Sequence, residues 1–198
     1  MITSTLDKEI KKDMRAKSAK PLLWIGMASI VMFFGGLTSA VIVKHGEGDW
    51  QGFELPLPFW ISTVIIILSS IAFNLALSAA KKDQQANIKK AIGATLLLGV
   101  AFMITQFMGW GTLKDQGIYL TGKTQQASGS YFLVLTWAHF AHLIGGIISL
   151  IVVFVNSSKD KYNSKNLLGL QLSATYWHFL GGLWIYLFIF LNFINQNF

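Results

Sequence analysis

Residues 129–150, GSYFLVLTWAHFAHLIGGIISL, contain no formally charged side chain, and this stretch decides the fold class. A helix rises 1.5 Å per residue, so about 20 apolar residues cross the roughly 30 Å hydrocarbon layer of a membrane. Backbone amides and carbonyls cannot stay unpaired in lipid, and such a stretch must therefore be helical. The stretch also carries His139 and His142, and ionisable groups within a membrane helix usually have a function.

Four further apolar stretches of similar length indicate that the chain crosses the membrane repeatedly. Strands of a membrane β-barrel would be about half as long and would alternate in polarity. We therefore expect an all-α integral membrane protein, with a cytoplasmic N-terminal segment over residues 1–20 and one membrane domain over residues 21–198. The domain is predicted to be a bundle of five transmembrane helices, at about residues 21–43, 57–80, 91–113, 131–155 and 167–194.

The composition agrees with this class. Hydrophobic residues make up 53% of the chain and charged residues 13%, about half the charged share of an average soluble domain. The chain has no cysteine, which excludes disulfides, iron–sulfur clusters and thiolate zinc sites.

The distribution of basic residues predicts how the bundle is oriented. Thirteen of the 16 basic residues precede the first stretch or lie in the second-to-third and fourth-to-fifth connections, and 3 lie in the other two connections. The positive-inside rule then predicts a cytoplasmic N-terminus and an external C-terminus. All 25 charged side chains are expected outside the helices. Because a nucleic-acid surface needs basic residues gathered on one folded face, the net charge of +7 does not indicate a nucleic-acid partner.

The depth of the histidines leaves three hypotheses open. His142 lies 11 residues after Tyr131, and His178 lies 11 residues after Leu167. Each is therefore about 16 Å from the border of its stretch, which places both near the middle of the membrane. Two imidazoles at one depth suit a haem between His142 and His178, an interhelical hydrogen bond, or a proton relay.

Other residues near this depth favour one of the three hypotheses but do not exclude the other two. His139 lies about one helical turn from His142 on the same face, and Gln106 falls near the level of His139. A copper or iron site made by His139, His142 and His178 is also conceivable. A proton relay usually includes a carboxylate, and metal-binding histidines are usually oriented by one. None of the five stretches contains an acidic residue, so polar contacts between helices are favoured.

Small residues mark where helices are expected to approach closely. Such residues let helix backbones pack tightly in lipid. The predicted packing positions are Gly35, Gly36, Gly145, Gly181 and Gly182.

Residues 129–146, GSYFLVLTWAHFAHLIGG, and residues 174–193, ATYWHFLGGLWIYLFIFLNF, resemble the last two helices of subunit III of haem–copper oxidases. In this cytochrome c oxidase subunit III family, a G-S-x-F…T…H…H…G-G helix precedes a Y-W-H-F…W helix. The earlier stretches resemble the family's W-x-x-x-x-S-x-x-x-F, P-x-x-x-T-x-x-L-x-x-S-S and G-x-x-F-x-x-x-Q-x-x-x-W helices. The resemblance covers about residues 21–193 and indicates the short, five-helix bacterial form.

The resemblance implies a non-catalytic subunit of a respiratory terminal oxidase in the bacterial cytoplasmic membrane. Such a subunit holds no haem or copper of its own. It packs on subunit I, which carries those centres, binds phospholipid, and supports proton uptake during oxygen reduction. No catalytic, cofactor-binding or metal-binding residue is expected in this chain. Gly146 joins the packing positions, and the family motif positions with structural roles are Gln106, Ser130, His139, His142, Tyr176, Trp177 and His178.

Two departures from the family pattern remove acid from the membrane. The family often has a carboxylate after the serine of its first matching helix, where this chain has Ile30. It also commonly has an aspartate shortly after Y-W-H-F, where this chain has Leu180, Gly181 and Gly182. Both departures argue against proton buffering within this subunit.

Two alternative functions stay open. One is a small membrane cytochrome b with its haem between His142 and His178. The other is a transporter, which would be expected to show broken helices or paired membrane charges.

Overall fold

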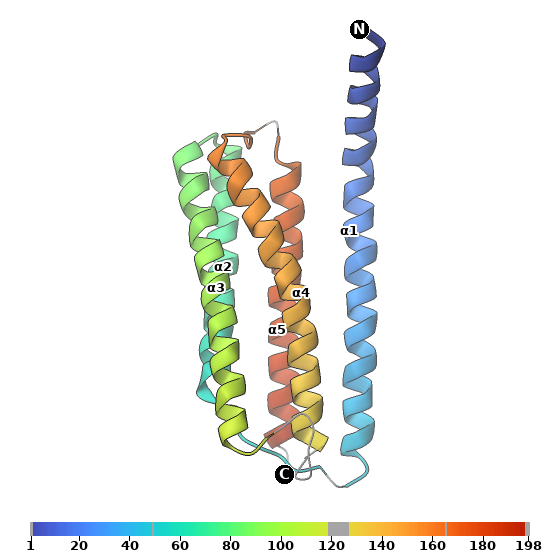
Figure 1. Ribbon diagram of the computed structural model, residues 1–198, viewed down its shortest axis with the longest axis vertical. Helices are drawn as coiled ribbons and strands as arrows, with labels where there is room; N and C mark the ends of the chain where they lie inside the picture. Colours follow the sequence, from blue (N-terminus) through green and yellow to red (C-terminus); the bar gives the residue numbers. More distant parts are fainter. Residues whose placement is uncertain (1, 49, 119–126, 165, 197–198) are drawn as a thin grey trace.

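The computed structural model describes residues 2–48, 50–118, 127–164 and 166–196, and every regular element within them is an α-helix (Figure 1). Each of the five helices contains a segment long and apolar enough to cross a membrane, which confirms the predicted all-α, five-span architecture. The helices are α1 (Ile2–His45), α2 (Leu57–Lys81), α3 (Gln85–Asp115), α4 (Ala127–Ser158) and α5 (Leu168–Gln196).

Helices α2 to α5 form the bundle, and α1 stands beside it (Figure 1). Within the bundle, α2 packs on α3 and α5, and α4 packs on α3 and α5. Helix α1 contacts only α4 and α5 among the described elements. The start of α1 and the end of α5 lie at opposite ends of the molecule, as an odd number of crossings requires (Figure 1).

Buried positions in the bundle are spaced alternately three and four residues apart, so the pattern repeats every seven residues. On α2 the fully enclosed positions include Phe59, Ser62, Ile66, Ser69 and Phe73. Helices α3 and α5 follow the same spacing. This repeat directs one stripe of each helix toward its neighbours and is typical of left-handed packing at a shallow angle. The stripe mixes serine, glycine and aromatic residues, so close fit rather than hydrophobicity distinguishes it from the lipid-facing surface.

The helices extend further than the apolar stretches. Helix α1 begins at Ile2 and contains Pro21, where the first stretch was expected to start, and α3 begins at Gln85 instead of residue 91. The expectation that all charged residues lie outside the helices was therefore wrong, since Lys89 and Lys90 belong to α3. Lysine can keep its amine in water while its stem follows an apolar helix, so a helix need not end where the hydrocarbon does. The cytoplasmic location of residues 1–20 stays a prediction.

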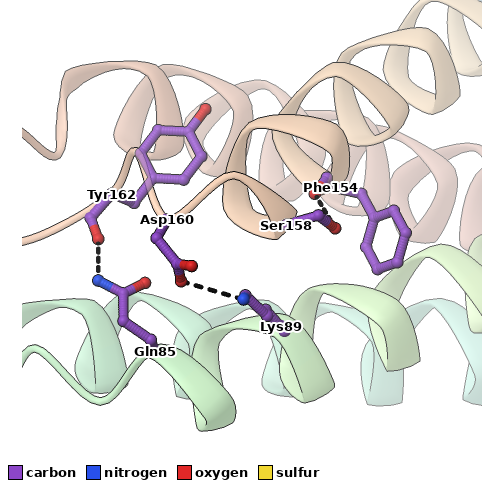
Figure 2. Close-up of polar contacts among 6 residues, drawn as sticks. All are labelled: Gln85, Lys89, Phe154, Ser158, Asp160 and Tyr162. Carbon is purple, nitrogen blue, oxygen red and sulfur yellow. Dashed lines mark hydrogen bonds and ion pairs between the residues drawn. The ribbon is translucent and has the colours of Figure 1, made fainter.

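Polar contacts tie the α2–α3 turn to the α4–α5 connection (Figure 2). The Gln85 side-chain amide donates to the Tyr162 carbonyl at 2.6 Å, and the Lys89 amine lies 3.0 Å from an Asp160 carboxylate oxygen. The Ser164 backbone amide donates to Asp83 at 2.6 Å. Burial raises the pKa of the Tyr162 phenol, although a hydrogen bond with Asn156 opposes this effect. These contacts hold together two connections that the charge distribution predicts to be cytoplasmic.

Two leucines on α3 test whether tight packing carries the stability of the bundle. Leu113 is 0% exposed and Leu97 is 70% exposed. We expect Leu113→Ala to lower the free energy of unfolding by about 2 kcal/mol, because it leaves a cavity between helices. The matched change Leu97→Ala faces lipid and should cost less than about 0.5 kcal/mol. Unfolding of the purified protein in mixed micelles, followed by circular dichroism, measures both, and equal losses would contradict the role given to packing.

Candidate functional site

Polar contacts between helices are centred on Trp177 of α5, whose side chain is 1% exposed. Its indole N–H donates to the Ser69 hydroxyl of α2 at 3.1 Å. The Ser69 hydroxyl in turn donates to the Thr95 carbonyl of α3 at 3.2 Å. A single chain of two hydrogen bonds thus links three helices in a region without bulk water.

Two glycines make room for the same indole. A β-carbon added to Gly99 of α3 would lie 2.8 Å from the Trp177 ring, and one added to Gly146 of α4 would lie 3.2 Å from it. Distances this short would force the ring or a helix to shift. Trp177 therefore touches α2, α3 and α4, and its position depends on the absence of side chains at Gly99 and Gly146.

Further side-chain hydrogen bonds connect neighbouring helices, including α1 and α4. Most pair a tryptophan, tyrosine or glutamine with a serine or threonine on a neighbouring helix. In membranes each such bond contributes roughly 0.6–2 kcal/mol. The pairs are Gln106–Ser62 at 3.0 Å, Trp184–Thr63 at 3.0 Å, Trp110–Thr136 at 3.1 Å, Ser149–Ser173 at 2.8 Å and Tyr186–Thr38 at 3.3 Å.

His139 lies at the centre of the fold, 1% exposed, in a cage of aromatic rings. Its ring centroid is 5.4 Å from that of Trp184 on α5, 6.3 Å from Phe102 on α3 and 6.5 Å from Phe34 on α1. Within the described part of the chain, neither imidazole nitrogen has a hydrogen-bond partner. This differs from the interhelical hydrogen bond expected from the sequence, because the groups that neighbouring helices present at this depth are rings.

His142 is held within its own helix and against α1. Its Nδ1 lies 2.7 Å from the Ala138 carbonyl, an acceptor, so this nitrogen carries the proton. The ring contacts Phe34 of α1 with centroids 5.6 Å apart. The Tyr176 hydroxyl of α5 donates to the His142 backbone carbonyl at 3.2 Å, which links α4 and α5 through the backbone.

His178 contacts a different helix. Its Nε2 lies 3.1 Å from the Asn74 side-chain oxygen of α2, and its ring packs beside Phe73. The His142 ring contacts Phe34 of α1, whereas His178 bonds to α2 and also lines a pocket with Lys20 and Trp24 of α1. Each imidazole thus has a protein partner of its own, Ala138 for His142 and Asn74 for His178. Among the residues that the structure describes, no group of three or more His, Cys, Asp or Glu side chains could hold a metal ion.

The other predicted positions differ in their surroundings. Gly145 faces the Tyr176 hydroxyl, with 3.5 Å to an added β-carbon, and Gly181 faces Ile66 of α2 at 3.4 Å. Added β-carbons at three other predicted positions would meet no atom within 4 Å in the part of the chain that the structure describes. Ser130, half-buried, lies in the first turn of α4. The three open positions are Gly35, Gly36 and Gly182.

Sequence reasoning missed the acceptors of the tryptophan hydrogen bonds. Thr63 and Thr136 accept from tryptophans, Ser62 accepts from Gln106, and all three donate their own hydroxyl within their helix. Ser69, which accepts from Trp177, donates instead to Thr95 of α3. Their signal was the seven-residue spacing from Ser62 to Ser69, which places both on one face of α2. Gly99, seven residues before Gln106, carries the same signal on α3.

Comparison with known proteins connects this arrangement to a family. The family model described as cytochrome c oxidase subunit III matches residues 38–196. This segment includes all of α2 to α5 and thus every contact of Trp177.

Individual proteins are similar over most of the chain. "Cytochrome c oxidase subunit 3" of Corynebacterium diphtheriae is 29% identical over 172 residues, covering 83% of this chain and 82% of that protein. "Probable quinol oxidase subunit 3" of Staphylococcus haemolyticus is 30% identical over 177 residues, covering 83% of each. "Cytochrome bo(3) ubiquinol oxidase subunit 3" of Pseudomonas aeruginosa is 28% identical, covering 83% of this chain and 79% of that protein.

A double-mutant cycle tests the Trp177–Ser69 hydrogen bond. We expect Trp177→Phe and Ser69→Ala to show a coupling free energy of about 1 kcal/mol, because each change alone removes the same interaction. The measurement is the unfolding free energy of the four proteins in mixed micelles. Trp24→Phe, which alters an exposed indole on α1, should show no coupling to Ser69→Ala. Coupling below about 0.3 kcal/mol for the Trp177 pair would mean that the bond is not formed.

Two glycines of α3 test the close approach to Trp177. Gly99→Ala should destabilise the protein by about 1–3 kcal/mol, because the new methyl group would overlap Trp177 and Ile147. Gly111→Ala is the control, since its β-carbon would meet no atom of the described residues within 4 Å. Gly111→Ala should leave stability unchanged or raise it by up to about 1 kcal/mol, because alanine favours helix. The same unfolding assay applies, and a tolerated Gly99→Ala would contradict the close packing.

Proposed function

The chain belongs to the cytochrome c oxidase subunit III family, and on that basis we propose that it is a structural subunit packed on subunit I of a haem–copper oxidase. It is a multi-pass protein of the bacterial inner membrane and a subunit III of such an oxidase. The observation that carries the proposal is the family match over residues 38–196, which coincides with the tightly packed bundle. Haem and copper belong, in this proposal, to the catalytic subunit.

The polar groups inside the bundle support a structural role. Trp177, Trp184 and Gln106 each donate to a hydroxyl on another helix. Nothing in these contacts requires a change of charge or the transfer of an electron. Their effect is to hold the helices at one rotation and depth, so that the outer surface presented to a partner has a defined shape.

A groove between α1 and α5 supports phospholipid binding. It has a volume of about 420 Å³ and an almost wholly apolar lining, which includes Phe34, Phe179 and Leu183. Gly35 and Gly182 also face it, which keeps it open at its centre. An acyl chain matches both its chemistry and its place between membrane helices.

Support for proton uptake is proposed to act through subunit I. The central parts of the helices hold no carboxylate, and the positions where the family often carries one are Ile30 and Gly181. Ile30 packs against the apolar core, and Gly181 faces Ile66 and Ser70. The chain therefore offers no internal acid to hold protons, and its contribution is to shield and support the surface of the subunit that takes them up.

The electron donor is proposed to bind elsewhere in the complex. The similar proteins carry the names of cytochrome c oxidases and of quinol oxidases at nearly the same identity, 29% and 30%. A scaffold shared at this level by both kinds of oxidase is unsuited to discriminate between a soluble protein donor and a membrane quinol. We assign that discrimination to other subunits.

Purification in mild detergent through a tag on this chain tests the proposal. We expect a haem–copper catalytic subunit to co-purify, with haem absorbance that follows the amount of that subunit. When the tagged chain is separated further from its partners, it should carry no Soret band of its own. An untagged strain is the control for nonspecific recovery. Recovery of the chain alone with its own haem would overturn the proposal and favour the cytochrome b alternative.

A further inference from the structure

A second groove lies at the turn end of the α2–α3 hairpin, away from the α1–α5 groove. Its volume is about 480 Å³, and it is bounded by both helices of the hairpin. One part of the lining is apolar and runs along the helices through Leu75, Ala79 and Ala91. The other part carries Lys82, at the end of α2, and Lys90, in the second turn of α3. The groove is thus amphipathic along its length.

The two lysines are available to a ligand. Both are exposed, and no ion pair involves them among the described residues. Their neighbour Lys89 differs, because its amine contacts Asp160 on the α4–α5 connection (Figure 2). The nearby acid Asp83 accepts the Ser164 backbone amide at 2.6 Å and does not line the groove. Two positive charges therefore face the groove without a carboxylate in its lining.

The start of α3 adds to this positive potential. A helix carries about half a positive charge at its amino end, and acidic residues in the first turn normally offset it. Helix α3 has no acidic residue in its first turn, and Gln84 at its N-cap makes no capping bond through its side chain. Instead, Asn87 donates to the Gln84 side-chain oxygen at 2.9 Å, and both side chains line the groove.

We propose that this groove binds an anionic phospholipid of the leaflet on the α2–α3 turn side. The phosphate lies between Lys82 and Lys90 at the start of α3, and an acyl chain follows Leu75, Ala79 and Ala91. The lining favours a lipid, because the two lysines lie near the helix ends and beside apolar positions of both helices. The inference rests on the phospholipid binding included in the proposed function and assigns it a second, charge-selective site.

Photo-cross-linking to the intact oxidase tests the site. The complex is reconstituted in phosphatidylcholine vesicles containing a small fraction of phosphatidylglycerol with a photoreactive acyl chain. Mass spectrometry then maps the adducts. We expect saturable labelling between residues 75 and 91, displaced by unlabelled phosphatidylglycerol and not by phosphatidylcholine. In the variant K82Q/K90Q the half-saturating lipid fraction should rise about 25-fold, since each lysine near an anionic lipid surface contributes about fivefold.

The control variant K159Q/K161Q removes the same charge from the other connection at this end of the bundle, outside the groove. Its half-saturating fraction should match the wild type. Equal shifts in both variants, no shift in K82Q/K90Q, or equal labelling by a phosphatidylcholine probe would overturn the inference. Both lysines are exposed, so K82Q/K90Q should still co-purify with the catalytic subunit. A failure of this site is therefore distinct from a failure of the proposed function.

Discussion

The bond from the Trp177 indole to Ser69 is the contact on which the bundle most depends. In hydrocarbon no water competes for the indole N–H, and an unpaired donor costs free energy. The bond specifies both the rotation of α5 and its depth against α2, and the onward bond to Thr95 extends that constraint to α3. Because Gly99 and Gly146 hold the same ring from two sides, a change at any of these positions acts on four helices.

The same physics explains why α1 stands apart. Lipid is as apolar as leucine, so helices associate in membranes only where surfaces fit closely or polar groups pair. Helix α1 pairs with the bundle through Thr38, which accepts from Tyr186 at 3.3 Å, and through the ring of Phe34. Elsewhere its small residues, including Gly35 and Gly36, approach no described atom of the bundle within 4 Å of an added β-carbon. A helix attached at few points leaves the α1–α5 groove beside it, and this groove is the first of the two proposed lipid sites.

The sequence predicted the helices better than their contacts. Apolar length alone located five spans, because the cost of unpaired backbone in lipid leaves no alternative to helix. The spacing along each helix predicts that His142 and His178 lie at one depth. It does not predict the direction of either side chain, and the structure shows the His142 ring against Phe34 of α1 and His178 against Asn74 of α2. The role of Ser69 was missed for a related reason. Its role depends on a tryptophan more than a hundred residues away, and one sequence does not carry that pairing.

The surroundings of His139 show that the interior of the bundle differs from a catalytic site. An imidazole with no hydrogen-bond partner among the described residues is costly, yet its ring packs against Phe34, Phe102 and Trp184 as one more aromatic side chain. The other polar groups of the bundle are mostly paired with one another and uncharged. The charges that could recognise a ligand, such as Lys82 and Lys90, lie at the helix ends. Binding by this chain is therefore expected at its periphery, because the interior polar groups already serve to hold the helices together.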